Sequence, residues 1–329
     1  MATNVTLMVP AHSDIVDDGF CRDFPEFNFR KVASVEELAA AMADTEILIT
    51  NTSAFYRTEV AAAVNANCAN LEWIQFTTSG VDMEARQNLP PGVRITNARG
   101  LRADILAAHA MALMLGVMRG FRQFEDYRER QEWARGAMCD VVQGPAGRTM
   151  VIAGLSATGH EIAQKAKAFG MTVIGVSRRG QAGEFIDRVV GRDRFREVLA
   201  MADVVMLTMT LDDETHHFLD AKGFAAMKPS AIVINPARGP LIDEAALIAA
   251  LEEGRIFGAG LDVTETEPLA PSSPLWRMKN VLISPHIGGH GDLAQKQRLT
   301  QIVAGNLRRY LDGRELNNMV EVEENGGHS

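Results

Sequence analysis

The amino-acid sequence predicts an α/β protein with parallel sheets, and two observations support this. First, the stretch from Thr149 to Arg179 reads as a short apolar strand, a glycine-containing turn, an amphipathic helix and a second apolar strand. A strand, helix and strand within about 30 residues has the size of a βαβ unit, whose two strands are parallel. Second, the same alternation continues on both sides of this stretch.

The N-terminal part of the chain predicts a small α/β unit of its own. Ser34 and Glu37 form the S-x-x-E pattern of a capping box ahead of an alanine-rich helix, and a further helix is expected at Thr58–Val64. The strand candidates are Thr6–Val9, Phe27–Val32, Glu46–Thr50, Leu71–Thr77 and Arg94–Asn97.

Downstream of Arg179, apolar runs predict further strands, with helices between most of them, notably Asp243–Glu253. With the first two strands these runs make six, the number in a doubly wound dinucleotide-binding sheet. An amphipathic last helix, Asp292–Leu311, is expected to pack on the N-terminal unit, and the polar tail Glu321–Ser329 is expected to be frayed. The runs are Asp203–Met209, Ala231–Pro236, Gly258–Val263 and Val281–Ser284.

The segment Leu101–Gly120 is apolar on nearly every face, so a helix there must be buried all round. Burial inside the core and burial against a second subunit explain this equally well. The following segment, Phe121–Asp140, is charged and is expected to be irregular.

Composition narrows the function classes. The 329 residues suit about two domains, and a net charge of −9 with a pI near 5.4 argues against nucleic-acid binding, which favours basic patches. The cysteines Cys21, Cys68 and Cys139 form neither a disulfide framework nor a metal-ligand spacing, which favours a reducing, cytoplasmic setting without a metal. We see no signal peptide, and the apolar run Ile105–Met118 is too short to cross a bilayer, so no membrane association is expected.

The turn after Thr149–Ala153 carries Gly154, Ser156 and Gly159 at the small positions of a G-x-G-x-x-G dinucleotide fingerprint. Small residues let the backbone turn tightly, let a pyrophosphate approach and let the helix pack near the strand. The helix N-terminus would then face the phosphates. Serine at the second position makes the match imperfect. We expect the turn to survive, with a slight shift of the pyrophosphate; a plain tight turn is the alternative.

Three ionisable residues follow three successive strand candidates. These are Arg238 in NPARGP, Glu267 in LDVTETEP and His286 in SPHIGG. In an open α/β sheet, ligands bind outside the carboxyl ends of the strands. Taken singly, each residue also fits a structural role: a helix cap, a solvated acid or a buried imidazole. Three complementary groups at three strand ends favour a site.

These residues lie in segments that resemble the D-isomer-specific 2-hydroxyacid dehydrogenases, over nearly the whole chain. The most specific segments are NPARGPLIDEAALIAAL, GAGLDVTETEPL and NVLISPHIGG. The resemblance implies two doubly wound Rossmann-like domains. A cofactor domain at 99–287 would be inserted into a smaller flavodoxin-like substrate domain, 1–98 plus 288–329. It also implies a homodimer formed through the cofactor domain, near the apolar helix at 101–120.

The resemblance further implies roles for the strand-end residues. Arg238 would hold the carboxylate of a 2-oxo acid and polarise its keto oxygen, a task suited to a planar bidentate cation. His286 would donate a proton to that oxygen as hydride arrives at the neighbouring carbon. Glu267 would favour the protonated imidazole. Ser79 and Gly80, in the turn that ends at Asp82, resemble the loop whose N–H groups bind the carboxylate; an ordinary glycine turn is the alternative.

The resemblance also indicates which residues meet the nicotinamide cofactor, with Asp262 near the carboxamide. The implied set is Gly154, Leu155, Ser156, Ala157, Thr158, Gly159, Ser177, Arg178, Arg179, Pro236, Ala237, Asp262, His286 and Gly288.

The end of the second strand in the stretch from Thr149 to Arg179 favours NADP(H), with NAD(H) as the alternative. Where an acidic residue would accept hydrogen bonds from the ribose 2′-OH of NAD, this chain has Ser177, followed by Arg178 and Arg179. Two guanidinium groups suit a 2′-phosphate. The alternative is a solvated arginine pair, or stacking on adenine.

The sequence therefore predicts an NADPH-preferring reductase of a small 2-oxo acid such as glyoxylate or hydroxypyruvate. Formate-, phosphite- or 3-phosphoglycerate-type oxidation on the same fold is one alternative. A non-catalytic, corepressor-like NAD(P)(H) sensor is another, and the intact set of Arg238, Glu267 and His286 speaks against it.

Overall fold

In a computed structural model, the chain forms two compact units. One comprises Met1–Leu101 and Asp292–Ser329, and the other comprises Arg102–Gly291. The structure describes residues 2–8, 16–81, 88–178, 183–291 and 294–320, so the tail Glu321–Ser329 lies outside it. These borders lie within a few residues of the expected domain borders, 98/99 and 287/288. The binding roles of the two units stay predictions.

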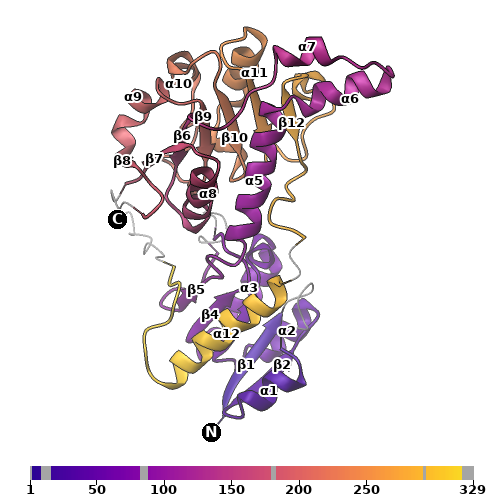
Figure 1. Ribbon diagram of the computed structural model, residues 1–329. Helices are drawn as coiled ribbons and strands as arrows, with labels where there is room; N and C mark the ends of the chain where they lie inside the picture. The colour runs from indigo at the N-terminus through magenta and orange to yellow at the C-terminus, as the bar shows by residue number, and fades with distance from the viewer. Residues whose placement is uncertain (1, 9–15, 82–87, 179–182, 292–293, 321–329) are drawn as a thin grey trace, which may run out of the picture. The chain divides into compact units, whose positions relative to one another are not determined.

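The first unit is a five-stranded parallel sheet in the order β2-β1-β3-β4-β5 (Figure 1). This is the strand order of flavodoxin-like sheets. All five predicted strands are present: β1 (Thr3–Met8), β2 (Phe27–Lys31), β3 (Ile47–Thr50), β4 (Trp73–Phe76) and β5 (Arg94–Thr96). The helices are α1 (Asp18–Asp23), α2 (Val35–Ala41), α3 (Thr58–Ala66) and the last helix, α12 (Gln295–Leu311), with a 3-10 turn at Thr52–Tyr56.

The last helix packs on the first sheet, as the sequence predicts. Leu299, Val303 and Leu307 of α12 join the same buried cluster as Trp73 of β4. Asn306 is fully buried, and its Nδ2 donates to Gln75 Oε1 at 2.8 Å. A buried amide needs such partners, so the bond ties α12 to β4.

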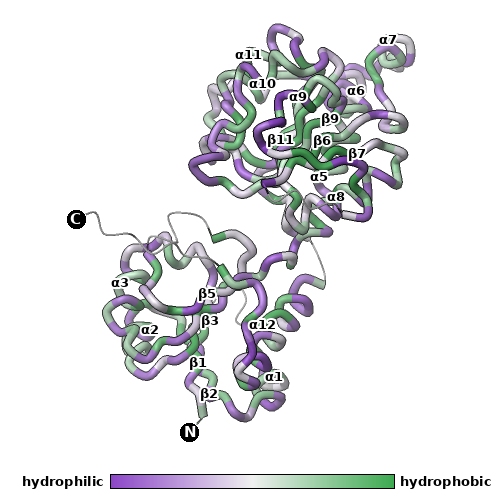
Figure 2. The backbone as a smooth tube through the Cα atoms, turned by 90° about the vertical axis from the view of Figure 1, so that its left-hand side faces the viewer, coloured by the Kyte–Doolittle hydropathy of each residue, from purple (hydrophilic) through white to green (hydrophobic). Residues whose placement is uncertain are grey.

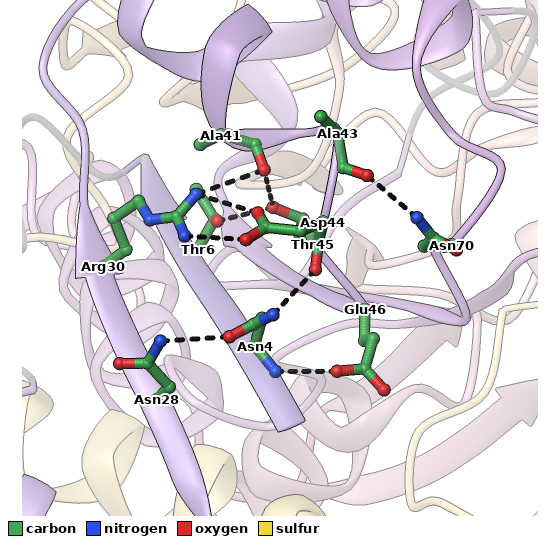
Figure 3. Close-up of polar contacts among 10 residues, drawn as sticks. All are labelled: Asn4, Thr6, Asn28, Arg30, Ala41, Ala43, Asp44, Thr45, Glu46 and Asn70. Atoms are coloured by element: carbon green, nitrogen blue, oxygen red, sulfur yellow. Dashed lines mark hydrogen bonds and ion pairs between the residues drawn. The ribbon is translucent and has the colours of Figure 1, made fainter. Parts of the chain in front are cut away.

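Polar contacts join β2 to β1 and to the turn that precedes β3 (Figure 3). Arg30 donates to both carboxylate oxygens of Asp44, at 2.9 and 3.1 Å. This bidentate bond holds the pKa of the Asp44 carboxyl below its usual range. Asn28 Nδ2 donates to Asn4 Oδ1 at 3.0 Å, which links β2 to β1.

The second unit is a parallel sheet in the order β12-β11-β10-β9-β6-β7-β8. The sequence predicted six of these strands and missed the edge strand β8 (Arg188–Val190), which pairs with β7 over only three residues. The other strands are β6 (Thr149–Ala153), β7 (Thr172–Val176), β9 (Val204–Leu207), β10 (Ile232–Asn235), β11 (Gly258–Leu261) and β12 (Val281–Ile283).

Helices cover both faces of the second sheet. On one face, α5 (Ala103–Met118) and α8 (Ala157–Ala168) share a buried cluster with Met150 and Ile152, whereas Val151 and Ala153 face the opposite cluster. Burial on both faces explains the continuous apolar strands, seen as the green segments β6 and β9 in Figure 2. The helices of the opposite face are α9 (Phe195–Leu199), α10 (Ala221–Ala226) and α11 (Glu244–Glu252). Short 3-10 turns span Arg192–Arg194, Gly239–Leu241 and Pro274–Arg277.

The expectation of an irregular segment at Phe121–Asp140 is wrong. The structure has α6 (Phe121–Glu129) and α7 (Arg135–Cys139) there. Helix α6 buries no residue, but ion pairs such as Arg122–Asp126, four residues apart at 2.8 Å, support it locally. Its charge, which suggested irregularity, is a solvated helix surface.

Among the described residues, no single helix is long and apolar enough to cross a membrane, and α5 with α6 would do so only as a pair bent by 59°. The cysteines Cys21, Cys68 and Cys139 are all free.

The loops that follow β10 and β11 pack backbone against backbone at Gly239. A Cβ atom there would lie 1.8 Å from the carbonyl oxygen of Thr264 and 2.6 Å from the nitrogen of Glu265. Neither atom belongs to a flexible side chain that could move aside. Glycine at this position therefore lets the two loops meet.

We predict that Gly239→Ala destabilises the second unit, because the methyl group must push the two loops apart. Overpacking of this kind typically costs about 1–3 kcal/mol. Urea unfolding followed by circular dichroism measures the loss. Gly136→Ala in α7, where a Cβ meets no atom within 4 Å, is the control and should unfold like the wild type. Equal midpoints for Gly239→Ala and wild type would contradict the prediction.

Candidate active site

Three loops meet at one edge of the second sheet. They follow β10, β11 and β12, which are neighbours in the sheet, and they carry Arg238, Glu267 and His286 in that order. Because all the strands are parallel, these loops share the carboxyl edge, where ligands bind in open α/β sheets. The strand ends picked out in the sequence are thus adjacent in space.

His286 and Glu267 form a hydrogen-bonded pair. Nδ1 of His286 lies 2.7 Å from Oε2 of Glu267, and the two side chains are 51% and 39% exposed. The other oxygen of Glu267 accepts from the N–H of Thr264 at 3.3 Å. With Nδ1 directed at the carboxylate, Nε2 is the ring atom that can exchange a proton with a substrate. The arrangement suits general acid–base chemistry.

Arg238 lies on the neighbouring strand end, half-buried. Its Nη1 donates to the carbonyl oxygen of Ala237 at 2.7 Å. The buried Asn235 braces this turn, since its Nδ2 donates to Arg238 O at 2.8 Å and its Oδ1 accepts from Ala237 N at 3.1 Å. Our sequence reasoning missed Asn235. The signal for it was a polar residue at the end of an otherwise apolar strand.

The loop of His286 is held by Asp262, the first residue after β11. Asp262 is 2% exposed. Its Oδ1 accepts from Ile287 N at 3.0 Å, its Oδ2 from Gly288 N at 2.8 Å, and its carbonyl oxygen from His286 N at 2.8 Å. The structure thus gives Asp262 and Gly288 a role in shaping the loop. Their contact with a nicotinamide stays a prediction.

The glycine turn after β6 needs both of its glycines. Gly154 has a φ of 103°, and a Cβ there would lie 2.6 Å from the nitrogen of Met209. A Cβ on Gly159 would lie 2.4 Å from Gly154 O. The first glycine thus permits the turn and the second permits close packing of helix on strand, the roles expected of a dinucleotide loop. These close approaches fit a pyrophosphate-binding turn.

Serine at the middle position does not disturb the turn. Ser156 has an ordinary φ of −75°, so no glycine is required there. Its hydroxyl caps α8 by accepting from Gly159 N at 3.2 Å. Leu155 lies beneath the turn against Gly175, while Ala157 and Thr158 form the first turn of the helix.

The end of β7 lies beside this turn, because Gly154 N donates to Val176 O at 2.9 Å. Ser177 follows directly, and its N–H pairs with Val190 O of the edge strand at 3.0 Å. Arg178 is exposed, whereas Arg179 lies outside the described residues. The structure therefore places an uncharged residue and an arginine next to the glycine turn.

The remaining predicted residues lie in loops after strands. Pro236 and Ala237 come directly after β10. In the first unit, Ser79 follows β4 by a few residues and donates from its hydroxyl to Ala98 O at 2.8 Å, and Gly80 is half-buried. Asp82 lies outside the described residues.

Two other polar groups do not resemble a 2-oxo acid site. A depression at the amino ends of β3 and β4 is lined by Asp44, Glu46 and Glu72, whose charges would repel an anion. His217 Nε2 lies 2.6 Å from Glu265 Oε1, and His216 is close enough for the three to be candidate metal ligands. The bond between His217 and Glu265 links the loop after β9 to the loop after β11, which explains why these side chains lie together.

Comparison with known proteins shows the family of this chain. The family model of the NAD-binding domain of D-isomer-specific 2-hydroxyacid dehydrogenases matches residues 111–288. A glyoxylate reductase of Thermococcus litoralis is 33% identical over 261 residues, which are 76% of this chain and 76% of the relative.

Two solved structures share the fold over nearly the whole chain. A D-isomer-specific 2-hydroxyacid dehydrogenase family protein of Aeromonas salmonicida is 28% identical with a TM-score of 0.83, covering 98% of this chain and 100% of that one. The enzyme of Xanthobacter autotrophicus Py2, solved with NADPH and MES, is 25% identical with a TM-score of 0.81, covering 98% and 99%. This chain therefore belongs to the D-isomer-specific 2-hydroxyacid dehydrogenase family of NAD(P)-dependent oxidoreductases.

Proposed function

We propose that this protein is an NADPH-preferring reductase that converts a small 2-oxo acid to a D-2-hydroxy acid. The observation that carries the proposal is the 2.7 Å pair of His286 and Glu267, one strand away from Arg238. A bound nicotinamide would supply the hydride to the keto carbon. Arg238 binds the carboxylate and polarises the keto oxygen, where negative charge develops. His286 gives its Nε2 proton to that oxygen, and Glu267 stabilises the imidazolium beforehand.

The preference for NADPH rests on the end of β7. Ser177 carries no charge that would repel a 2′-phosphate, and Arg178 is exposed beside the glycine turn. An arginine at this place accommodates the 2′-phosphate in related folds. The Xanthobacter autotrophicus structure, which contains NADPH, supports this choice.

The substrate is proposed to be glyoxylate, hydroxypyruvate or a 2-oxo acid of similar size. The similarity to a glyoxylate reductase supports this. We retain the prediction that N–H groups of the Ser79–Gly80 turn bind the substrate carboxylate. Two alternatives remain: an enzyme that oxidises formate, phosphite or 3-phosphoglycerate, and a sensor that turns over no substrate. The next experiment distinguishes both from a reductase.

We predict that the protein oxidises NADPH in the presence of glyoxylate or hydroxypyruvate, with a higher kcat/KM than with NADH. Ser177→Asp should move the preference toward NADH, because a carboxylate repels the 2′-phosphate and accepts from the ribose hydroxyl. The measurement is loss of absorbance at the nicotinamide band over a panel of 2-oxo acids with both reduced cofactors, and gain of absorbance with formate, phosphite or 3-phosphoglycerate and both oxidised cofactors. A higher kcat/KM with NADH would refute the arginine argument. Cofactor binding without turnover of any substrate would indicate a sensor.

We predict that His286→Asn lowers kcat by at least about 100-fold, because general acid catalysis contributes about 10²–10⁴-fold. Cofactor affinity, measured by fluorescence titration, should persist. His290→Asn is the matched control, an exposed histidine four residues further along, and should keep near-wild-type rates. Near-wild-type activity of His286→Asn would show that another group is the acid.

We further propose that the protein forms a homodimer through the second unit, with a contact surface that differs from the expected one. Helix α5 is largely buried within its own unit and exposes only a narrow stripe, with Ala108 and Ala112 at its centre. The neighbouring segment exposes Phe121 (52%), Phe124 (39%) and Trp133 (94%). An exposed aromatic group of this kind is typical of interaction surfaces, and a second copy is its proposed occupant.

We predict that Trp133→Glu combined with Phe124→Glu converts a dimer to a monomer, because buried charges would disrupt the contact. Sedimentation velocity measures the change. Trp276→Glu, at a 48% exposed tryptophan outside this segment, should leave the mass unchanged. A wild-type monomer at all concentrations would disprove the dimer.

A further inference from the structure

We propose that His109 is a positioning residue that holds the loop of His286 through Ser284 and Asp262. The inference rests on the proposed function, because the loop matters through the acid that it carries. His109 lies on α5, and its Nε2 is 2.8 Å from the hydroxyl of Ser284, the first residue after β12. The sequence signal was an imidazole that interrupts an apolar helix.

The loop has an uncommon conformation that Asp262 enforces. His286 has a φ of 54°, in the left-handed region that non-glycine residues seldom occupy. Three consecutive N–H groups, of His286, Ile287 and Gly288, all donate to Asp262. Two of these bonds go to the carboxylate and one to the backbone carbonyl oxygen, so Asp262 must be correctly placed for His286 to keep its conformation.

Ser284 extends this network to His109. Its hydroxyl donates to Asp262 Oδ1 at 2.6 Å, the short distance of a charge-assisted bond. A hydroxyl has one proton, so the Ser284 oxygen can only accept from His109. Nε2 of His109 also lies 3.2 Å from Asp262 Oδ1. Nε2 therefore carries a hydrogen, and its N–H is directed at the buried carboxylate and its serine partner.

Packing brings the imidazole against the same loop. A Cβ on Gly288 would lie 2.7 Å from Asp262 Oδ2 and 2.9 Å from Cδ2 of His109. The loop backbone is thus confined between the carboxylate and the ring. His109 acts on His286 only through these intermediates, so it positions the acid and is not itself catalytic.

The size of the expected effect follows from geometry. Displacement of a reacting group by about 1 Å can cost about 100-fold in rate. Loss of the His109 donor would leave Ser284 and Asp262 underbonded in a buried place and would let the loop relax. We expect a smaller displacement than 1 Å, and hence a loss of about 10- to 100-fold in kcat.

The test compares His109→Gln, whose amide can donate near the position of Nε2, with His109→Met, which keeps the bulk and removes the donor. With NADPH and glyoxylate, the Met variant should lose about 10- to 100-fold in kcat. Its KM for NADPH should change less than kcat, because the glycine turn that is predicted to hold the pyrophosphate is untouched. The Gln variant should restore most of the rate. Hydrogen exchange of a peptide spanning 284–288 should be faster in the Met variant alone.

Equal kcat and equal exchange in wild type and His109→Met would overturn the proposal, as would equal losses in the Gln and Met variants. If wild type turns over no 2-oxo acid, the proposed function fails by itself. The exchange comparison then decides: faster exchange only in the Met variant supports the positioning role, and unchanged exchange refutes it. If His109→Met does not fold, Ser284→Ala removes the middle of the same network and should show the same two effects.

Discussion

A buried carboxylate must be surrounded by hydrogen-bond donors, and at Asp262 this requirement shapes the site. The donors come from the loop after β12 and are the N–H groups of Ile287 and Gly288 and the hydroxyl of Ser284, while the N–H of His286 donates to the backbone carbonyl oxygen of Asp262. Desolvation of an unpaired carboxylate would be costly, so the loop cannot leave without a large penalty. The acid is thus placed by a charge that takes no part in the proton transfer.

The same region is assembled by close contact between loop backbones. Gly239 touches the backbone of Thr264, and Glu265 exchanges hydrogen bonds with Glu244 at the start of α11. Glu267 follows two residues later and meets His286. Arg238, Glu267 and His286 are therefore set by one continuous arrangement of three loops, in which a displacement of one would be felt by the others.

The net charge of −9 makes local cationic groups necessary for binding anionic ligands. An acidic protein repels anions at long range, so a 2-oxo acid and a phosphorylated cofactor must be held by local groups. Arg238 and Arg178 are such groups, and the helix that begins at Ser156 offers its amino end. The acidic depression at the amino ends of β3 and β4 has no arginine or lysine among the described residues that line it.

The sequence by itself determined the elements whose signals are local. Apolar strand runs, the cap at Ser34, the two glycines of the turn and the polar residues at three strand ends are readable within a few residues. The parallel topology then brings those strand ends together. Edge strand β8 and the charged helix α6 were missed, because β8 buries only one of its three residues and α6 buries none. Only the tertiary structure decided that Asp262 accepts hydrogen bonds from the His286 loop and that His109 is hydrogen-bonded to Ser284. The latter contact joins residues 175 positions apart, and no local pattern encodes a hydrogen bond across that distance.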